Sequence, residues 1–132
     1  MDSIERSIIV DTSAAEAFST WLRFENWPHF LKAIRTVRRL DESKFQLFIE
    51  RGGKEYESVV ELSLVIPPTR IAWRTVSGVD KSGVVCFEAL PDGRSKVSFK
   101  MKYFHEAGWN HPHILAQRLE SHLACFKKFV EN

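Results

Sequence analysis

Three side chains that carry polar atoms fall at positions which strand alternation or helical spacing would turn toward the interior. They are Tyr56, Tyr103 and His122. A buried phenol or imidazole needs a hydrogen-bonding partner, which can be backbone, a trapped water or a bound molecule. His122 is the best candidate for acid–base chemistry, because an imidazole titrates near neutral pH. No carboxylate is spaced to orient it, so a histidine satisfied in the core or at its rim is the simpler interpretation and no catalytic residue is assigned.

Apolar side chains share the inward positions with these three. The inward-facing set is Tyr56, Trp73, Phe87, Phe99, Met101, Tyr103, Leu115, Leu119 and His122. Trp27, with Phe30 nearby, is expected to form one wall of a cavity mouth. Aromatic residues at a period of two ordinarily pack a core, so the same set fits either a filled interior or a pocket. We take all of these residues as candidate ligand-binding residues.

Other chemistries find little support in the sequence. His105, His111 and His113 lie close together, but no cysteine or aspartate accompanies them at ligand spacing. There is no nucleophile elbow, no visible catalytic triad and no phosphate-binding loop. We therefore expect neither a metal site nor a cofactor.

The first part of the chain reads as a strand followed by two helices. Ser3 to Asp11 is rich in β-branched residues and predicts a strand. Ser13 and Glu16 form a capping box at the start of an amphipathic helix. A second, short helix is expected from Phe24 to Leu31, with Asn26 as its cap and Pro28 in its first turn.

From Ile34 the apolar pattern changes to a period of two. Gly52-Gly53 indicates a hairpin turn. One face of the strand after it is expected to carry Tyr56, Ser58, Val60, Leu62, Leu64 and Ile66. The clearest strand runs through Val97 and Tyr103, with apolar residues on one side and lysines on the other. A sheet with one dry face and one wet face is typical of antiparallel strands covered on a single side.

Asn110 to Asn132 predicts one long helix, with Asn110 as its cap and Pro112 in its first turn. Its apolar stripe consists of Leu115, Leu119, His122, Leu123, Phe126 and Val130. A long meander with one amphipathic helix indicates that the sheet curls around that helix.

The composition limits the class of protein. The 132 residues fit one domain spanning 1–132, and the net charge of +2 is spread along the chain, which gives no footprint for nucleic acid. Arg35, Arg38 and Arg39 are read as a solvated strand edge. Cys86 and Cys125 are expected to be free thiols in a reducing, cytoplasmic setting. Neither a signal peptide nor a membrane-spanning segment is apparent.

Four segments in register resemble a known family. They are Phe24-Glu25-Asn26-Trp27-Pro28, the stretch from Pro67 to Arg74, the stretch from Gly83 to Phe87, and the stretch from Leu119 to Glu131. Together they resemble the polyketide cyclase/dehydrase-like proteins of the START and birch-pollen-allergen (SRPBCC) superfamily. The resemblance implies an α+β helix-grip fold. In it, a seven-stranded curved antiparallel sheet wraps around a long C-terminal helix, two short helices lie between the first and second strands, and an apolar cavity lies between sheet and helix.

The resulting hypothesis is that the chain binds an apolar small molecule, such as a lipid, polyketide or quinone-like compound, in that cavity. An enzyme acting as a polyketide aromatase/cyclase is the first alternative. A protein-interaction domain whose cavity is filled by its own side chains is the second. The sequence leaves open the identity of the ligand and whether the chain forms a homodimer.

Overall fold

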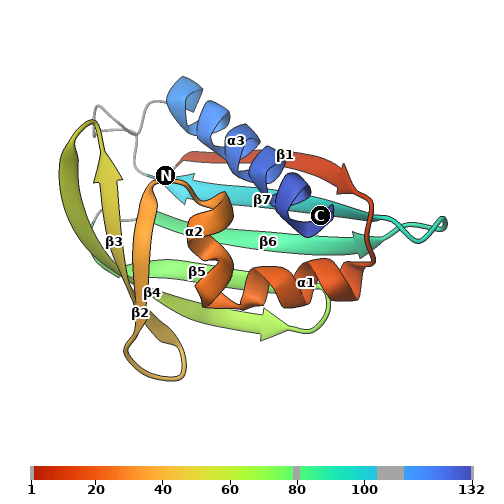
Figure 1. Ribbon diagram of the computed structural model, residues 1–132, viewed down its shortest axis with the longest axis horizontal. Helices are drawn as coiled ribbons and strands as arrows, with labels where there is room; N and C mark the ends of the chain where they lie inside the picture. Colours follow the sequence, from red (N-terminus) through yellow and green to blue (C-terminus); the bar gives the residue numbers. More distant parts are fainter. Residues whose placement is uncertain (1, 79–80, 104–111, 132) are drawn as a thin grey trace.

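The computed structural model describes residues 2–78, 81–103 and 112–131. Its strands are β1 (Asp2–Val10), β2 (Ile34–Arg39), β3 (Lys44–Arg51), β4 (Lys54–Ile66), β5 (Arg70–Ser77), β6 (Lys81–Ala89) and β7 (Ser95–Tyr103). Its helices are α1 (Ala14–Leu22), the short 3-10 helix η1 (Phe24–Asn26), α2 (Trp27–Phe30) and α3 (Pro112–Glu131). The elements follow one another along the chain as the expected fold requires (Figure 1).

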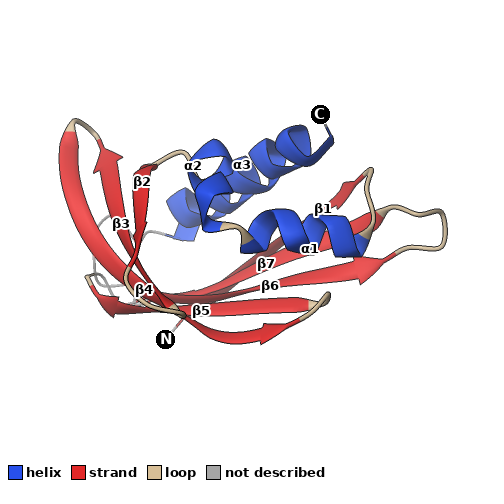
Figure 2. Ribbon diagram, turned by 60° about the horizontal axis from the view of Figure 1, so that its bottom comes forward, coloured by secondary structure: helices blue, strands red, loops and turns tan. Residues whose placement is uncertain are grey.

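The seven strands form one antiparallel sheet in the order β1-β7-β6-β5-β4-β3-β2. Each strand from β2 to β6 pairs with the next strand along the chain, and β1 forms the far edge beside β7. The sheet is strongly curved, and its β2–β4 end rises toward the helices (Figure 2). Helix α3 lies across β1 and β7 and packs against α2, while α1 covers β6. The predicted helix-grip arrangement is therefore confirmed.

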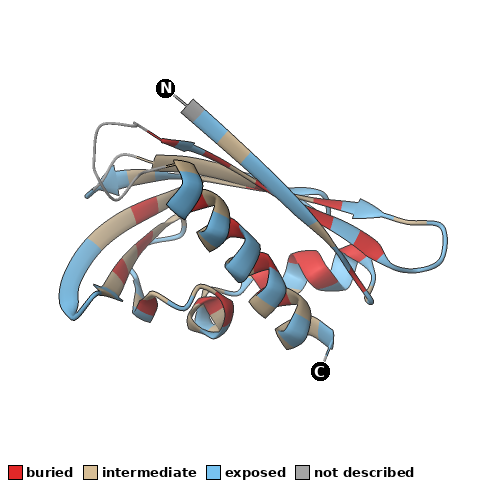
Figure 3. Ribbon diagram, turned by 90° about the horizontal axis from the view of Figure 1, so that it is seen from above, coloured by how far each residue is buried: buried red, intermediate tan, exposed pale blue. Residues whose placement is uncertain are grey.

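Helix α3 turns one stripe toward the concave face of the sheet. The buried residues of this helix are Leu115, Leu119, Leu123 and Phe126. They recur at intervals of three and four, so one side of the helix is buried while the other stays exposed (Figure 3). All four belong to the predicted stripe, whereas its other two residues, His122 and Val130, are only partly buried.

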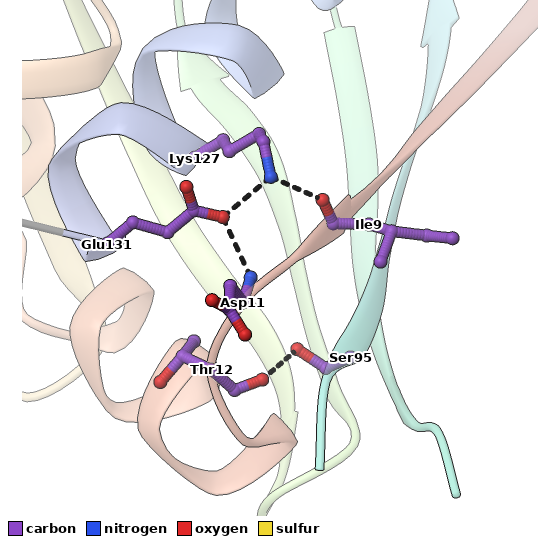
Figure 4. A network of polar contacts seen from close by, with 6 residues as sticks. All are labelled: Ile9, Asp11, Thr12, Ser95, Lys127 and Glu131. Atoms are coloured by element: carbon purple, nitrogen blue, oxygen red, sulfur yellow. Dashed lines mark hydrogen bonds and ion pairs between the residues drawn. The ribbon is translucent and has the colours of Figure 1, made fainter. Parts of the chain in front are cut away.

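Polar contacts fix the C-terminal end of α3 to the end of β1 (Figure 4). The carboxylate of Glu131 accepts hydrogen bonds from Lys127 Nζ (2.6 Å) and from the backbone N–H of Asp11 (2.8 Å). Lys127 Nζ also donates to the carbonyl of Ile9 at 3.0 Å. Nearby, Ser95 Oγ donates to the carbonyl of Thr12 at 2.9 Å and joins β7 to the start of the helical segment. The helix is therefore held at a defined height above the sheet.

The helical segment differs in detail from the expectation. Ser13 caps α1 as predicted, because its hydroxyl accepts the backbone N–H of Glu16 at 3.1 Å. The second helix is split into η1 and α2, and Asn26 does not cap it. Its side-chain amide instead donates to the carbonyl of Thr20 at 3.0 Å, which ties η1 back to α1. The other expected cap, Asn110, lies outside the described residues.

Strand β4 contains a register shift that simple alternation does not reveal. Its pairing with β5 slips between Leu62 and Leu64, so that Ser63 is the additional residue of a bulge. The expectation that Leu64 and Ile66 face inward with Leu62 is therefore wrong. One additional residue reverses the facing of the side chains after it, and both Leu64 and Ile66 are 43% exposed.

Both cysteines, Cys86 on β6 and Cys125 on α3, are free thiols, as predicted. None of the helices in the described part of the chain has the length and apolar character needed to span a bilayer.

Candidate ligand cavity

A cavity of about 570 Å³ lies inside the curve of the sheet, beneath the helices. This volume falls within the range of about 300–1,000 Å³ found for small-molecule sites. Most of its wall is apolar. The large apolar side chains that line it are Trp21, Trp27, Leu31, Ile34, Leu47, Ile49, Val60, Leu62, Ile71, Trp73, Phe99 and Met101.

Two tryptophans from the helical segment form the wall nearest α1 and α2. Trp27 Nε1 donates to the carbonyl of Trp21 at 2.8 Å, so the buried indole N–H is satisfied and its ring orientation is fixed. The Trp27 ring packs edge-on against Phe45 of β3, with the centroids 5.2 Å apart. Trp21 packs in the same way against Phe99 of β7, at 5.6 Å. These contacts join the helices to both ends of the sheet.

Strands β4, β5 and β6 form the opposite wall. Trp73 lies opposite Leu62 on β4 and opposite Gly83 on β6, so all three positions face the same side of the sheet. The indole of Trp73 spreads over Gly83, where any side chain would collide with it. The missing side chain at Gly83 therefore provides the space that the Trp73 ring occupies.

The structure divides the predicted site residues into two groups. Those that line the cavity are Trp27, Tyr56, Trp73, Phe99, Met101 and His122. Those that are buried elsewhere are Phe30, Phe87, Tyr103, Leu115 and Leu119.

Sequence alternation shows which face of the sheet a residue occupies but not what covers that face. Phe87 packs against Phe18 of α1, with the ring centroids 5.7 Å apart. Phe30 packs against Phe126 of α3, at 5.1 Å. Where the helices rest directly on the concave face, inward side chains fill the core. Where the sheet curves away from the helices, they line the cavity.

His122 lies at the boundary between the core and the cavity. Its ring lies nearly parallel to that of Phe99, with the centroids 6.4 Å apart. Burial, followed by the positive charges of Arg51 and Arg118, lowers the pKa of His122 from 6.5 to about 4. The backbone of Phe30 lies beside the ring and favours the protonated form, which partly offsets the lowering of its pKa. The imidazole is therefore neutral near pH 7.

Tyr56 is 48% exposed and lines the cavity from the β3–β4 hairpin, so it belongs to the rim rather than to the interior. Its position at the rim follows from the register, because Tyr56 lies opposite Ile49 and only two residue pairs separate it from the end of the hairpin.

Three cations that the sequence interpretation overlooked also line the cavity: Arg51, Lys81 and Arg118. Burial, followed by the charges of Arg51 and Arg118, lowers the pKa of Lys81 to about 7. Burial and the charge of Arg118 lower the pKa of Arg51 to about 10. The inward position of Arg51 was predictable from the sequence. Alternation along β3 places it on the same face of the sheet as Leu47 and Ile49.

The donor chemistry of the cavity suits an organic ligand rather than a metal ion. Within residues 2–78, 81–103 and 112–131, no group of three histidine, cysteine or carboxylate side chains is placed to hold a metal. His105 and His111, two of the three clustered histidines, lie outside those ranges. An apolar wall with cations and an imidazole at one end can desolvate a hydrophobic body and orient a polar group.

Comparison with known proteins identifies a family and a curated relative. Residues 10–124 match the family described as polyketide cyclase / dehydrase and lipid transport. A curated relative, the uncharacterized 17.2 kDa protein in the melC2-rnhH intergenic region of Streptomyces lincolnensis, is 27% identical over 143 residues, covering 99% of this chain and 91% of that protein.

Two solved structures share the fold. A START superfamily protein from Mycobacterium smegmatis is 15% identical, with a TM-score of 0.85 over 98% of this chain and 97% of the other. The Zhui aromatase/cyclase from Streptomyces sp. R1128 is 15% identical, with a TM-score of 0.80 over 98% of this chain and 93% of the other. At these identities the likeness concerns the fold alone.

Proposed function

We propose that this chain, which belongs to the polyketide cyclase / dehydrase and lipid transport family, binds an apolar small molecule in the cavity between its sheet and its helices. The observation that carries this proposal is the cavity of about 570 Å³ with a largely aromatic and aliphatic wall. Protein interiors ordinarily pack as densely as organic crystals, so a space of this size is unusual for a core and ordinary for a binding site.

Burial supplies the affinity in this mechanism. Trp27, Trp73 and Phe99 line the cavity from three different elements, and each would remove apolar surface of the ligand from water. The fixed positions of the Trp27 ring and the Trp73 ring lower the cost of ordering the site when a ligand enters. Polar groups at one end then determine the direction in which the ligand lies.

The experiment that tests the proposal is native mass spectrometry of protein purified without denaturation, followed by titration with the neutral dye N-phenylnaphthylamine. We expect a co-purified small molecule or saturable binding of one dye per chain. A protein that carries no small molecule and binds no apolar dye would contradict the proposal. It would favour the interaction domain with a filled cavity.

A second candidate function is that of an aromatase/cyclase. The observation that favours it is the presence of Arg51, Lys81 and neutral His122 beside an apolar chamber. Such cations would stabilise the negative charge of an enolate, and a folded chamber would bring distant carbons of a poly-ketone chain together. Conversion of a poly-ketone surrogate to a cyclic product would identify the enzyme, whereas binding without turnover would identify a carrier.

A further inference from the structure

The cavity has one strongly basic end. Arg51 is the last residue of β3, Lys81 is the first of β6, and Arg118 lies one turn before His122 on α3. These positions are far apart in the sequence, yet all three side chains line the same cavity. Their shared position agrees with the pKa shifts, because the charge of Arg118 lowers the pKa of Arg51, and those of Arg51 and Arg118 lower the pKa of Lys81.

A second hollow of about 290 Å³ adjoins this end. Arg51, Arg118 and His122 line both spaces, and Lys32 from the segment between α2 and β2 adds a further cation to the second. Gly52 lies between the two hollows at the hairpin turn. The basic end is therefore continuous with an outer space that Lys32 and Ser121 also line.

An oxyanion that enters this end of the cavity would be attracted by all three cations, because they line the same wall. Guanidinium groups are suited to this role, since each presents a planar fork of donors that matches a carboxylate or a phosphate. Elsewhere in the lining, Val60, Leu62 and Ile71 offer apolar surface, and Glu57, Ser58 and Thr75 add a few polar atoms.

We infer that the ligand is an amphipathic anion: an apolar ring system or chain occupies the cavity, and a single anionic group lies between Arg51, Lys81 and Arg118. This inference rests on the proposed function, because it specifies the chemistry of one end of the bound molecule. The shared chemistry is that of an oxyanion, whether carboxylate, phosphate or sulfonate.

A matched pair of dyes tests the inference. N-phenylnaphthylamine is neutral, and anilinonaphthalene sulfonate adds one anionic group to the same frame. We expect the parent protein to bind the sulfonate about tenfold more tightly, as one charge-assisted contact would give. Arg51→Gln and Arg118→Gln should each remove most of that difference between the two dyes.

Arg94→Gln is the matched control, because it removes the same charge at the exposed β6–β7 turn. It should leave both affinities unchanged. Arg118→Lys keeps the charge but loses the fork, and it should retain part of the preference. The affinities of the two dyes are first compared on the parent protein. This comparison remains valid even if a variant fails to fold.

The outcomes are distinct. If the parent protein binds the neutral dye as tightly as the sulfonate, the inference is overturned and the proposed function stands. If it binds neither dye, both are overturned. When the preference is present, competition with dodecanoate and with dodecyl phosphate ranks carboxylate against phosphate.

Discussion

The indole of Trp73 covers Gly83 on the neighbouring strand so closely that a β-carbon at Gly83 would lie 2.7 Å from the ring. The two residues are register partners in the β5–β6 pair, and Trp73 lines the cavity. The ring cannot lie flat against β6 unless residue 83 lacks a side chain. The position of this wall of the cavity is therefore set by a glycine.

Replacing Gly83 with alanine should displace the Trp73 indole into the cavity. We expect a loss of about 1–3 kcal/mol in the free energy of unfolding, as for other overpacked sites. The affinity for N-phenylnaphthylamine should also change, because the wall has moved. Chemical denaturation and dye titration measure the two effects.

A second substitution provides the control for this prediction. Trp73→Leu in the Gly83→Ala background makes room for the new methyl group and should recover part of the lost stability. If Gly83→Ala alone leaves both stability and dye binding unchanged, the close approach of these two residues does not shape the cavity.

Trp73→Ala distinguishes a ligand cavity from a packed core. Phe126, which is 0% exposed, provides the reference, because Phe126→Ala should cost about 3–5 kcal/mol. Trp73 has the cavity on one side of its ring, so its truncation should cost clearly less while changing the affinity for the neutral dye. Equal losses in the two variants, with no dye binding by the parent protein, would show a filled core.

The sequence predicted the order of the elements because each relies on a local signal. Alternation identified the strands, Ser13 the start of α1, and the spacing from Leu115 to Phe126 the buried side of α3. The bulge at Ser63 was not predictable, because the residues on either side continue the same apolar pattern. A slip of register leaves no trace in composition.

The candidate site was predicted only in part, for a different reason. Trp73 and Phe87 both face the concave side of the sheet, as predicted. Of these two, Trp73 lines the cavity and Phe87 is buried in the core. Which inward residues a helix covers depends on where the sheet begins to curve away from it, which is a long-range property. The basic residues Arg51 and Lys81 were overlooked because single charges on strands ordinarily point to solvent.

His122 should make the stability of the protein depend on pH. Its pKa is lowered to about 4 in the folded chain, whereas the ordinary value is 6.5. Between these values the unfolded chain binds a proton that the folded chain does not, so the free energy of unfolding falls as the pH drops. The stabilisation is complete above pH 6.5, and its loss should approach about 3 kcal/mol near pH 4.

Denaturation of the parent protein and of His122→Gln across this range isolates the effect. Arg51, Lys81 and Arg118 face His122, and the pKa values of Arg51 (about 10) and Lys81 (about 7) lie above this window. The variant should therefore lose less stability on acidification than the parent. Gln117→Ala, an exposed change on the same helix, should behave like the parent. Parallel curves for the parent and His122→Gln would contradict the prediction.

Lys81 should make the binding of an anion depend on pH near neutrality. Its pKa is lowered to about 7, so the ammonium is fully charged below that value and loses its proton above it. Arg51 and Arg118 face it and stay charged near neutral pH, while His122 is already neutral. Lys81 is therefore a group in the cavity wall that changes charge near pH 7.

We expect the affinity for anilinonaphthalene sulfonate to fall by up to about tenfold as the pH rises from about 6 to 9. A bound anion raises the pKa of Lys81, so the fall should extend above pH 7 rather than end there. The neutral dye should show no such trend, and Lys81→Met should remove it for the sulfonate. Lys102→Met, an exposed lysine on β7, is the matched control and should keep the parent profile. A level profile for the sulfonate in the parent protein would show that Lys81 does not contact the anionic group.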